Sequence, residues 1–272
     1  MTSTAAQMAS APVAGAAIAI ARIDVTYGVG GPEPVHALAG IDLEVPDGAF
    51  VSLVGPSGCG KSTLLKVVAD LMAPTQGSVT IGGLAPRALR RAGRIGLVFQ
   101  QANLMPWLKI ADNIALLRAL VRKRGAAAPD AARIADLIRV VGLAGFEAKY
   151  PHQLSGGMQQ RAALARALAL DPAVLLMDEP FAALDEITRD RMAFELMRIW
   201  HHYRKTVLFV THSLAEAVFL SDKVVLMSAR PGRIHRVFEV DLPRPRDRET
   251  RLSDRFHAIV RDVNRELYRV MS

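Results

Sequence analysis

The stretch 53–63 constrains the fold of this chain more than any other, because it joins a strand, a glycine-rich turn and a helix start. Residues 50–54, Phe-Val-Ser-Leu-Val, are short and mostly apolar, which is typical of a strand buried on both faces. Gly55 to Ser62 fits the pattern G-x-x-x-x-G-K-S/T residue for residue. Such glycines let successive backbone N–H groups point at one anion, and the helix adds its positive N-terminal end. The stretch therefore predicts a phosphate-binding loop, in which Lys61 reaches the β- and γ-phosphates and Ser62 binds Mg²⁺.

The flanking strand and helix disfavour the alternative, a glycine-rich loop that binds no ligand. We expect these residues to contribute to a nucleotide-binding site: Gly55, Pro56, Ser57, Gly58, Cys59, Gly60, Lys61, Ser62 and Thr63. Cys59 is the one cysteine of the chain, so the sequence offers no internal disulfide and does not support a Cys/His metal site. This cysteine usage fits a reducing compartment.

The chain has 272 residues, enough to bury a sizeable core in one large domain or two small ones. No stretch approaches the roughly 18 uncharged apolar residues of a membrane-spanning helix, so we expect a soluble chain. Residues 1–16 are rich in alanine and serine and carry no lysine or arginine. They lack the basic region of a signal peptide, and we expect them to form a disordered tail.

The formal net charge of +8 can indicate a nucleic acid, an anionic membrane surface or a nucleotide as the partner. The basic residues are mostly dispersed among acidic ones, and their densest region is 244–269. Acidic residues accompany the arginines throughout that region. We therefore interpret it as a solvated, ion-paired helix rather than as a groove for nucleic acid.

Short apolar strands alternate with helical patterns along the chain, which predicts an α/β fold with a mainly parallel sheet. The predicted strands are 18–27, 41–45, 50–54, 77–81, 95–99, 174–177, 206–210, 223–227 and 233–240. The predicted helices are 61–71, 110–124, 131–141, 155–170, 184–202, 213–220 and 254–271. Residues 101–153 show almost no strand signal, and 125–129 would join two helices. We expect residues 101–165 to form a helical subdomain inserted into the α/β core.

Residues 174–179, Val-Leu-Leu-Met-Asp-Glu, end an apolar strand with two acids. Ligands of open parallel sheets bind at the carboxyl ends of the strands, where these acids would lie. Asp178 would hold Mg²⁺ directly or through water, and Glu179 would polarise the attacking water as a general base. An ordinary solvated strand end stays open as the alternative on this motif alone.

Residues 154–161 read Leu-Ser-Gly-Gly-Met-Gln-Gln-Arg. Ser155, followed by Gly156 and Gly157 at a helix start, would build a second anion site from backbone N–H groups and a hydroxyl. The alternative is a plain N-cap. Two glycines in a first turn weaken a helix, which favours the special role.

Together these motifs resemble those of the ABC transporter ATPase family. The family signature LSGGQ corresponds to residues 154–158, with methionine in place of glutamine at the fifth position. The other family motifs are present in the expected order, at Tyr27, Gln100, Ala183-Leu184-Asp185 and His212. The resemblance covers residues 17–240 as one ABC ATPase domain and leaves 241–272 as a basic helical C-terminal extension.

The resemblance implies a P-loop NTPase core of the RecA type, an antiparallel β subdomain and a helical signature subdomain. It also implies that two ATPase chains face each other head to tail. Each ATP would lie between the phosphate loop of one chain and the segment Ser155-Gly156-Gly157 of the other. Closing on ATP and opening after hydrolysis would then drive transport.

The family pattern implies a role for each remaining motif residue. Tyr27 would stack on adenine, and His212 would contact the γ-phosphate and help hold the water. Gln100 would touch Mg²⁺ or that water and couple the site to a partner. Asp185 would complete the nucleotide-binding set. The alternatives are a histidine at 212 that is merely a core or surface residue, and a Tyr27 packed in the core.

Two stretches, 104–107 and 227–234, resemble the nitrate/sulfonate/taurine branch of ABC importers, and the segment 242–246 agrees with it. The branch implies the ATP-hydrolysing subunit of an importer for a small anion, peripheral on the cytoplasmic face of the cell (inner) membrane. The implied partners are a second, identical ATPase subunit, transmembrane permease subunits and a periplasmic or extracellular solute-binding protein, with no nucleic acid. Bicarbonate-like anions and thiamine precursors are alternative substrates. In such importers residues 103–108 border a groove for a permease helix, the alternative being helical-subdomain core.

Two other functions compete with transport. A non-transport ABC ATPase acting on DNA would carry long coiled coils or zinc modules before the signature. The interval 101–154 is short and shows neither heptads nor cysteine pairs. A small-molecule kinase could use the same phosphate loop, but Glu179 beside Asp178 and the segment 154–157 argue against it.

Overall fold

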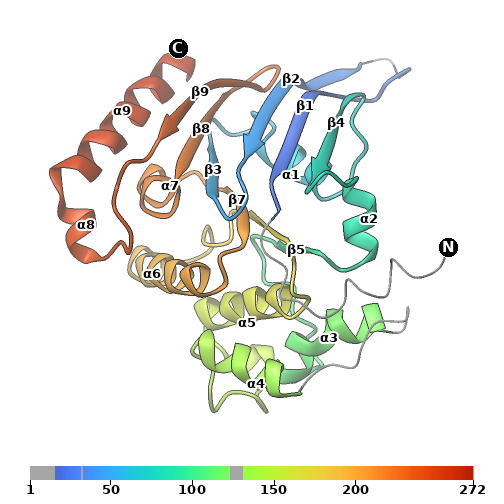
Figure 1. The fold of residues 1–272 in the computed structure, drawn as a ribbon, viewed down its shortest axis with the longest axis vertical. Helices are drawn as coiled ribbons and strands as arrows, with labels where there is room; N and C mark the ends of the chain where they lie inside the picture. Colours follow the sequence, from blue (N-terminus) through green and yellow to red (C-terminus); the bar gives the residue numbers. More distant parts are fainter. Residues whose placement is uncertain (1–15, 32, 123–130, 272) are drawn as a thin grey trace.

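A computed structural model describes residues 16–31, 33–122 and 131–271 of the chain (Figure 1). The expected tail 1–16 lies outside the described residues except for Ala16, and the expected joint 125–129 lies outside them entirely. Figure 1 shows the strands at the centre, a helical lobe at one end of the molecule, and the C-terminal helices along one side.

The centre of the molecule is a six-stranded sheet in the order β5-β6-β7-β3-β8-β9. Its strands are β3 (Phe50–Val54), β5 (Ile95–Val98), β6 (Val174–Asp178), β7 (Thr206–Val210), β8 (Lys223–Ser228) and β9 (Arg233–Glu239). The first five strands in this order are parallel to one another, whereas β9 is antiparallel to β8. The predicted mainly parallel sheet is confirmed, and the carboxyl ends of β5, β6, β7 and β3 meet at one edge.

Helices cover both faces of this sheet. They are α1 (Lys61–Val68), α5 (Gly156–Leu168), α6 (Glu186–Tyr203), α7 (Leu214–Leu220) and α9 (Asp254–Met271). Successive residues of a strand point to opposite faces, so each strand contributes to two apolar cores. On β3, Phe50 and Val54 pack with α5, α6, α7 and α9, whereas Val51 and Leu53 pack with α1.

A second, three-stranded sheet packs over the α1 side of the first. It consists of β1 (Ile18–Tyr27), β2 (Val35–Val45) and β4 (Gln76–Ile81) in the order β2-β1-β4, with antiparallel pairing throughout. Its buried residues, such as Ile23 and Ile41, belong to the same core as Leu64 and Leu65 of α1. This sheet confirms the expected antiparallel β subdomain.

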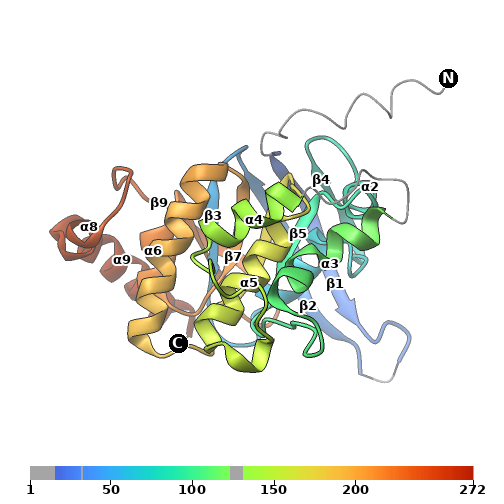
Figure 2. The same cartoon turned by 90° about the horizontal axis from the view of Figure 1, so that it is seen from below.

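The helical lobe contains α3 (Ile110–Arg122), α4 (Ala131–Val140) and the short 3-10 turn Pro151–Gln153 ahead of α5. Between residues 101 and 153 the described part of the chain contains no strand. The buried residues Ile114 and Leu137 join the core that α5 shares with the central sheet. Figure 2, seen from below, shows these helices projecting from the sheet toward the viewer.

Several predicted boundaries differ from the structure. The short helices α2 (Pro86–Arg91) and α8 (Arg248–Leu252) were not predicted, because 6 and 5 residues span too little of a helical repeat. The helix predicted over 184–202 begins at Glu186, since the Asp185 carboxylate accepts the Thr188 N–H at 3.0 Å and caps it. Helix α1 ends at Val68, and Asp70 turns the chain with a φ of +56°.

The expectation of a solvated, ion-paired helix over residues 244–269 is correct for α9 but not for Arg246. Exposed ion pairs are indeed present, at Arg255–Asp241 and Arg265–Asp262. Arg246, by contrast, is 4% exposed, and it lies before the helices rather than within one. Sequence spacing shows arginines next to acids, but it does not show which of them fold under α7.

The Arg246 guanidinium closes the C-terminal end of α7. It donates to backbone carbonyls of Val218, Phe219, Ser221 and Leu242 at 2.8–3.2 Å. The last carbonyls of a helix lack intrahelical partners and carry partial negative charge, so a cation is stabilised there. Burial lowers the pKa of Arg246 to about 10.

Replacing Arg246 with alanine is expected to lower the free energy of unfolding by about 3 kcal/mol, because buried carbonyls lose a charged donor. Urea unfolding followed by tryptophan fluorescence would measure the loss. Arg248→Ala is the matched control, since Arg248 is exposed at the start of α8 and should change stability by no more than about 0.5 kcal/mol. An equal loss in both variants would contradict the buried clamp.

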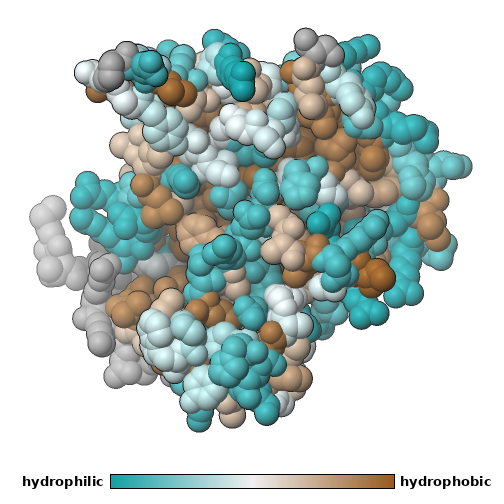
Figure 3. All heavy atoms as spheres, turned by 180° about the vertical axis from the view of Figure 1, so that it is seen from behind, coloured by the Kyte–Doolittle hydropathy of each residue, from teal (hydrophilic) through white to brown (hydrophobic). Residues whose placement is uncertain are grey.

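In the described ranges, no helix is both long enough and apolar enough to cross a membrane. Seen from behind, hydrophobic side chains lie in small groups between hydrophilic ones (Figure 3).

Candidate functional site

The phosphate loop 55–60 leaves the carboxyl end of β3 and enters α1 at Lys61. Gly55 has a φ of +152°, and a Cβ there would lie 2.5 Å from the carbonyl oxygen of Met227. Gly60 has a φ of +94°, and its Cβ would lie 2.5 Å from Cδ2 of Leu38. Only glycine fits both positions, so the tight turn depends on these residues. Cys59, between them, is fully buried against the core and does not face the loop surface.

Lys61 places its ammonium group at the mouth of this loop. Its Nζ donates to the carbonyls of Gly55 at 2.8 Å and Pro56 at 2.9 Å, and lies 3.6 Å from Sγ of Cys59. The side chain is 7% exposed. Its oxygen acceptors in the loop are carbonyls, and no carboxylate forms a salt bridge with it among the described residues, so the ammonium group is available to an anion.

Ser62 and Asp178 meet beside the loop. The Ser62 hydroxyl donates to Oδ1 of Asp178 at 2.8 Å, although the residues are 116 positions apart. Burial raises the pKa of Asp178, and the hydrogen bond from Ser62 partly opposes this increase. A hydroxyl and a carboxylate are hard oxygen ligands of the kind that Mg²⁺ accepts beside phosphate oxygens and water. The two residues therefore fit a magnesium ion.

Glu179 and His212 lie side by side because they follow neighbouring parallel strands, β6 and β7. Oε2 of Glu179 is 3.4 Å from Nδ1 of His212. Glu179 adopts a φ of +46°, which is uncommon for a residue with a side chain, and its N–H donates to the Val210 carbonyl at 2.9 Å. Strained backbone of this kind is concentrated at functional sites.

Tyr27 and Gln100 lie at the edge of this region. The hydroxyls of Tyr27 and Thr63 are hydrogen-bonded at 3.0 Å, and Tyr27 is 40% exposed, so it is not packed in the core. Gln100 is exposed directly after β5, and no hydrogen bond or ion pair of its side chain is present among the described residues. It is thus free to reach a ligand or a partner.

Two residues that the sequence did not single out hold the loop around Gln100. Gln160 donates to the Phe99 carbonyl at 2.8 Å, and Arg166 donates to the carbonyls of Ala102 and Asn103 at 2.7 Å each. Both lie on α5, and both are buried. The sequence signal that could have identified them is that they are polar residues among the buried alanines and leucines of α5.

Ser155, Gly156 and Gly157 open α5 in the helical lobe. The Ser155 hydroxyl accepts the Met158 N–H at 3.4 Å, as in an ordinary N-cap. A Cβ on Gly157 would lie 3.0 Å from Thr188, so this turn faces the start of α6. Among the described residues, no hydrogen bond or ion pair joins it to the phosphate loop of the same chain.

Asp185 precedes α6 at the same place. Its side chain accepts the Thr188 N–H, and this hydrogen bonding lowers the pKa of the Asp185 carboxyl. The carboxylate is therefore ionised at neutral pH and committed to capping α6.

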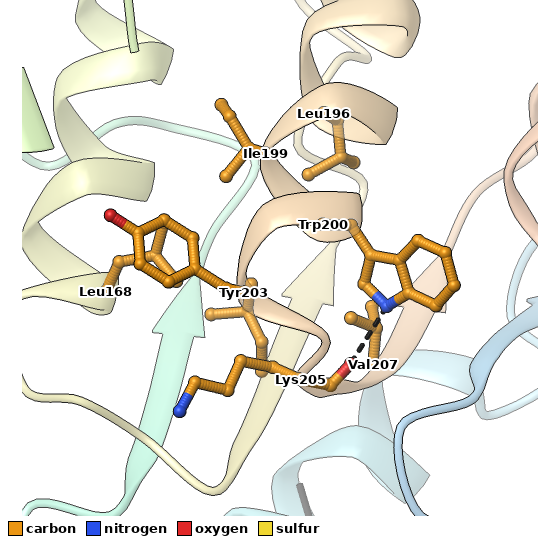
Figure 4. Close-up of a pocket in the computed structure, with 8 residues that line it drawn as sticks. Leu168, Leu196, Ile199, Trp200, Tyr203, Lys205 and Val207 are labelled. Atoms are coloured by element: carbon orange, nitrogen blue, oxygen red, sulfur yellow. Dashed lines mark hydrogen bonds between the residues drawn. The ribbon is translucent and has the colours of Figure 1, made fainter. Parts of the chain in front are cut away.

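A small apolar cavity of about 10 Å³ lies elsewhere, between α5, α6 and β7. Figure 4 shows Trp200 beside it, with the indole N–H donating to the Lys205 carbonyl at 2.9 Å. Lys205 precedes β7, so the cavity lies toward the amino ends of the strands, away from Glu179 and His212. It is a packing defect and not a ligand site.

The fold and the loop, acids and histidine at one sheet edge define a P-loop NTPase. Comparisons agree. The ABC transporter family model matches residues 38–182. The chain is 51% identical over 218 residues to an uncharacterized ABC transporter ATP-binding protein of Methanocaldococcus jannaschii, covering 79% of each chain. The solved dimeric ATP-binding cassette MJ0796, bound to ADP and Pi, has a TM-score of 0.70 at 34% identity, over 82% of this chain and 98% of that one.

Two further relatives carry transport names. The aliphatic sulfonates import ATP-binding protein SsuB of Bacillus cereus is 43% identical over 235 residues, covering 86% of this chain and 90% of that protein. The bicarbonate transport ATP-binding protein CmpC of Synechocystis is 46% identical over 233 residues, covering 85% of this chain but 34% of that protein. The chain therefore belongs to the ABC transporter family and is one of its ATPases.

Proposed function

We propose that this chain is the ATP-hydrolysing subunit of an importer for a small anion such as a sulfonate, nitrate, taurine or bicarbonate. The observation that carries the ATPase assignment is the meeting of Ser62 with Asp178 and of Glu179 with His212 at one sheet edge. The names of the sulfonate and bicarbonate relatives support the importer and the anion.

ATP would bind with its phosphates on the loop 55–60 and its β- and γ-phosphates at Lys61. Ser62, Asp178 and Gln100 would hold Mg²⁺, which when bound neutralises phosphate charge. Glu179 would take a proton from the attacking water, and His212 would contact the γ-phosphate. Tyr27, whose exposed ring is fixed through Thr63, would stack on adenine.

A second copy of the chain would complete each site. In the described part of the chain, Ser155, Gly156 and Gly157 make no hydrogen bond to the phosphate loop of their own chain, and they open a helix whose N–H groups suit an anion. The dimeric form of the MJ0796 cassette supports the pairing of two chains. In a head-to-tail pair, this segment would face the partner's ATP. Asp185, at the contact between this segment and α6, would lie at the same interface.

The importer would place the chain at the cytoplasmic face of the inner membrane, beside permease subunits and a solute-binding protein. The segment 104–108 is suited to a permease contact, because Trp107 is 70% exposed. The fully buried Asn113 holds the loop that carries Trp107, since it accepts the Met105 N–H at 2.7 Å and donates to the Leu108 carbonyl at 2.9 Å. An exposed indole on a loop held in this way is typical of an interface anchor.

The proposal is tested by purifying the tagged chain from detergent-solubilised native membranes and identifying the proteins that copurify. We expect to recover a multi-span permease together with a solute-binding protein. Recovery with nucleic acid and without any membrane protein would contradict transport. Transfer of phosphate to an added small molecule, instead of release as free phosphate, would indicate a kinase.

Trp107→Ala is expected to weaken capture of the permease about tenfold or more, while the ATPase rate of the isolated chain stays unchanged. The reason is that the indole is exposed in the single chain. Among the described residues it makes no hydrogen bond to Lys61 or Glu179. Quantitative immunoblotting of the copurified permease would measure the effect. Leu252→Ala, which removes a side chain that is 71% exposed on α8, is the control. Equal capture by both variants would exclude this loop from the interface.

A further inference from the structure

A polar cluster lies under the loop that carries His212, between α6, α7 and α8. At its centre is Glu216, which is 4% exposed in the first turn of α7. The Thr211 hydroxyl, itself 2% exposed, donates to Oε2 of Glu216 at 2.7 Å. Burial raises the pKa of Glu216, an effect that the Thr211 hydrogen bond opposes. A buried carboxyl group is costly, so its presence calls for an explanation beyond packing.

The cluster fixes the backbone on both sides of His212. The Ser213 N–H donates to Oγ1 of Thr211 at 3.0 Å, and the Ser213 hydroxyl accepts the Glu216 N–H at 3.3 Å. Thr211 and Ser213 are thus bonded to each other and to Glu216. Among the residues that the structure describes, the imidazole of His212 has one polar contact, with Glu179, and its side chain is 53% exposed. Its position therefore depends on how Glu216 holds its two neighbours.

Arg189 extends the cluster to the turn before α6. Its Nε lies 3.4 Å from Oε1 of Glu216, an ionic contact whose geometry falls short of a hydrogen bond. Its Nη2 donates to the Leu184 carbonyl at 3.1 Å. Arg189 therefore touches both the turn 183–185 and the carboxylate that holds the histidine loop.

The C-terminal segment closes the cluster from the other side. Arg251 of α8 forms an ion pair with Asp190 and stacks over the ring of Phe219 at 4.5 Å. A cavity of about 200 Å³ remains between these groups, lined by Arg189, Glu216 and Arg251 among others. The cavity leaves room for the carboxylate and Arg189 to change distance.

We propose that Glu216 is a positioning residue for His212, acting through Thr211, and that Arg189 links it to the turn 183–185. The inference rests on the proposed function, because the role of His212 in hydrolysis is proposed there. Movement of that turn, which would lie at the dimer interface, would pass through Arg189 and Glu216 to the histidine. Glu216 would then act on the site through Thr211, without contacting the nucleotide or the attacking water itself.

The test uses steady-state ATP hydrolysis by the full chain. Glu216→Gln and Thr211→Val should each lower kcat about tenfold and leave KM for ATP within about twofold, because positioning is lost and binding is not. Thr211→Ser keeps the hydroxyl and should retain wild-type kcat. Glu195→Gln is the matched control, since Glu195 lies on α6 and, within the described ranges, its one ion pair is with Arg198 of the same helix. A low kcat in Thr211→Ser equal to that of Thr211→Val would overturn the inference.

The decisive comparison is made in a His212→Ala background, by single-turnover measurement. If Glu216 acts through His212, Glu216→Gln adds no further loss there. A full additional tenfold loss would show that Glu216 acts independently, which overturns this inference and leaves the ATPase assignment intact. His212→Ala without effect on kcat would instead remove the catalytic role of His212 given under the proposed function, and this inference with it. Thermal unfolding of each variant identifies any loss that comes from misfolding.

Discussion

Lys61→Ala is expected to remove nearly all ATP hydrolysis, with kcat/KM falling by about 10² to 10³. The Lys61 ammonium is the one lysine Nζ bonded to the phosphate loop among the described residues, at 2.8 Å and 2.9 Å from the carbonyls of Gly55 and Pro56. Those carbonyls would keep the loop shape but cannot replace a positive charge at the β- and γ-phosphates. Phosphate release and fluorescent-nucleotide binding would measure the two parts of the loss.

Lys66→Ala is the control for this substitution. Lys66 lies on the same helix but is exposed, and its side chain makes no hydrogen bond or ion pair among the described residues. The Lys66 charge lowers the pKa of Asp178 but its side chain does not bond to the phosphate loop, so Lys66→Ala should bind ATP and keep most of the wild-type hydrolysis. Circular dichroism of both variants would check that α1 is intact. Wild-type hydrolysis by Lys61→Ala would refute the assignment of 55–62 as the phosphate site.

The local part of the site was predictable because each element is encoded in adjacent residues. The phosphate loop and the helix start follow from the spacing of Gly55, Gly60 and Lys61, and the strand before them follows from the apolar residues 50–54. The pairing of Glu179 with His212 required one further step, that parallel strands end at a common edge. The structure places the two side chains 3.4 Å apart.

Contacts between distant segments were not predictable in the same way. Gln160 and Arg166 hold the loop after β5 from positions about 60 residues away, and their spacing carries no mark of that loop. The antiparallel direction of β9 depends on a short turn after β8 that apolar pattern does not specify. From sequence alone, Arg246 cannot be distinguished from the surface arginines near it, because its contacts with the end of α7 depend on the tertiary fold.

Glu179→Gln is expected to bind ATP, form an ATP-dependent dimer and hydrolyse ATP at least about 10²-fold more slowly than the wild-type chain. Glutamine keeps the shape and one carbonyl oxygen near His212, so the left-handed backbone and the contact between β6 and β7 should persist. It cannot accept a proton from water at neutral pH, which removes the general base. Since ATP is no longer consumed, the closed dimer should accumulate.

The expected dimer is measured by size-exclusion chromatography with light scattering, with ATP and with ADP. The matched control is Glu44→Gln, an exposed carboxylate on β2 remote from the sheet edge, which should hydrolyse ATP normally and show no lasting dimer. A Glu179→Gln chain with normal turnover would exclude Glu179 as the base, and attention would pass to Asp178 and His212. Slow turnover without a dimer would confirm Glu179 as the base. It would contradict the expected closure of a head-to-tail pair on ATP.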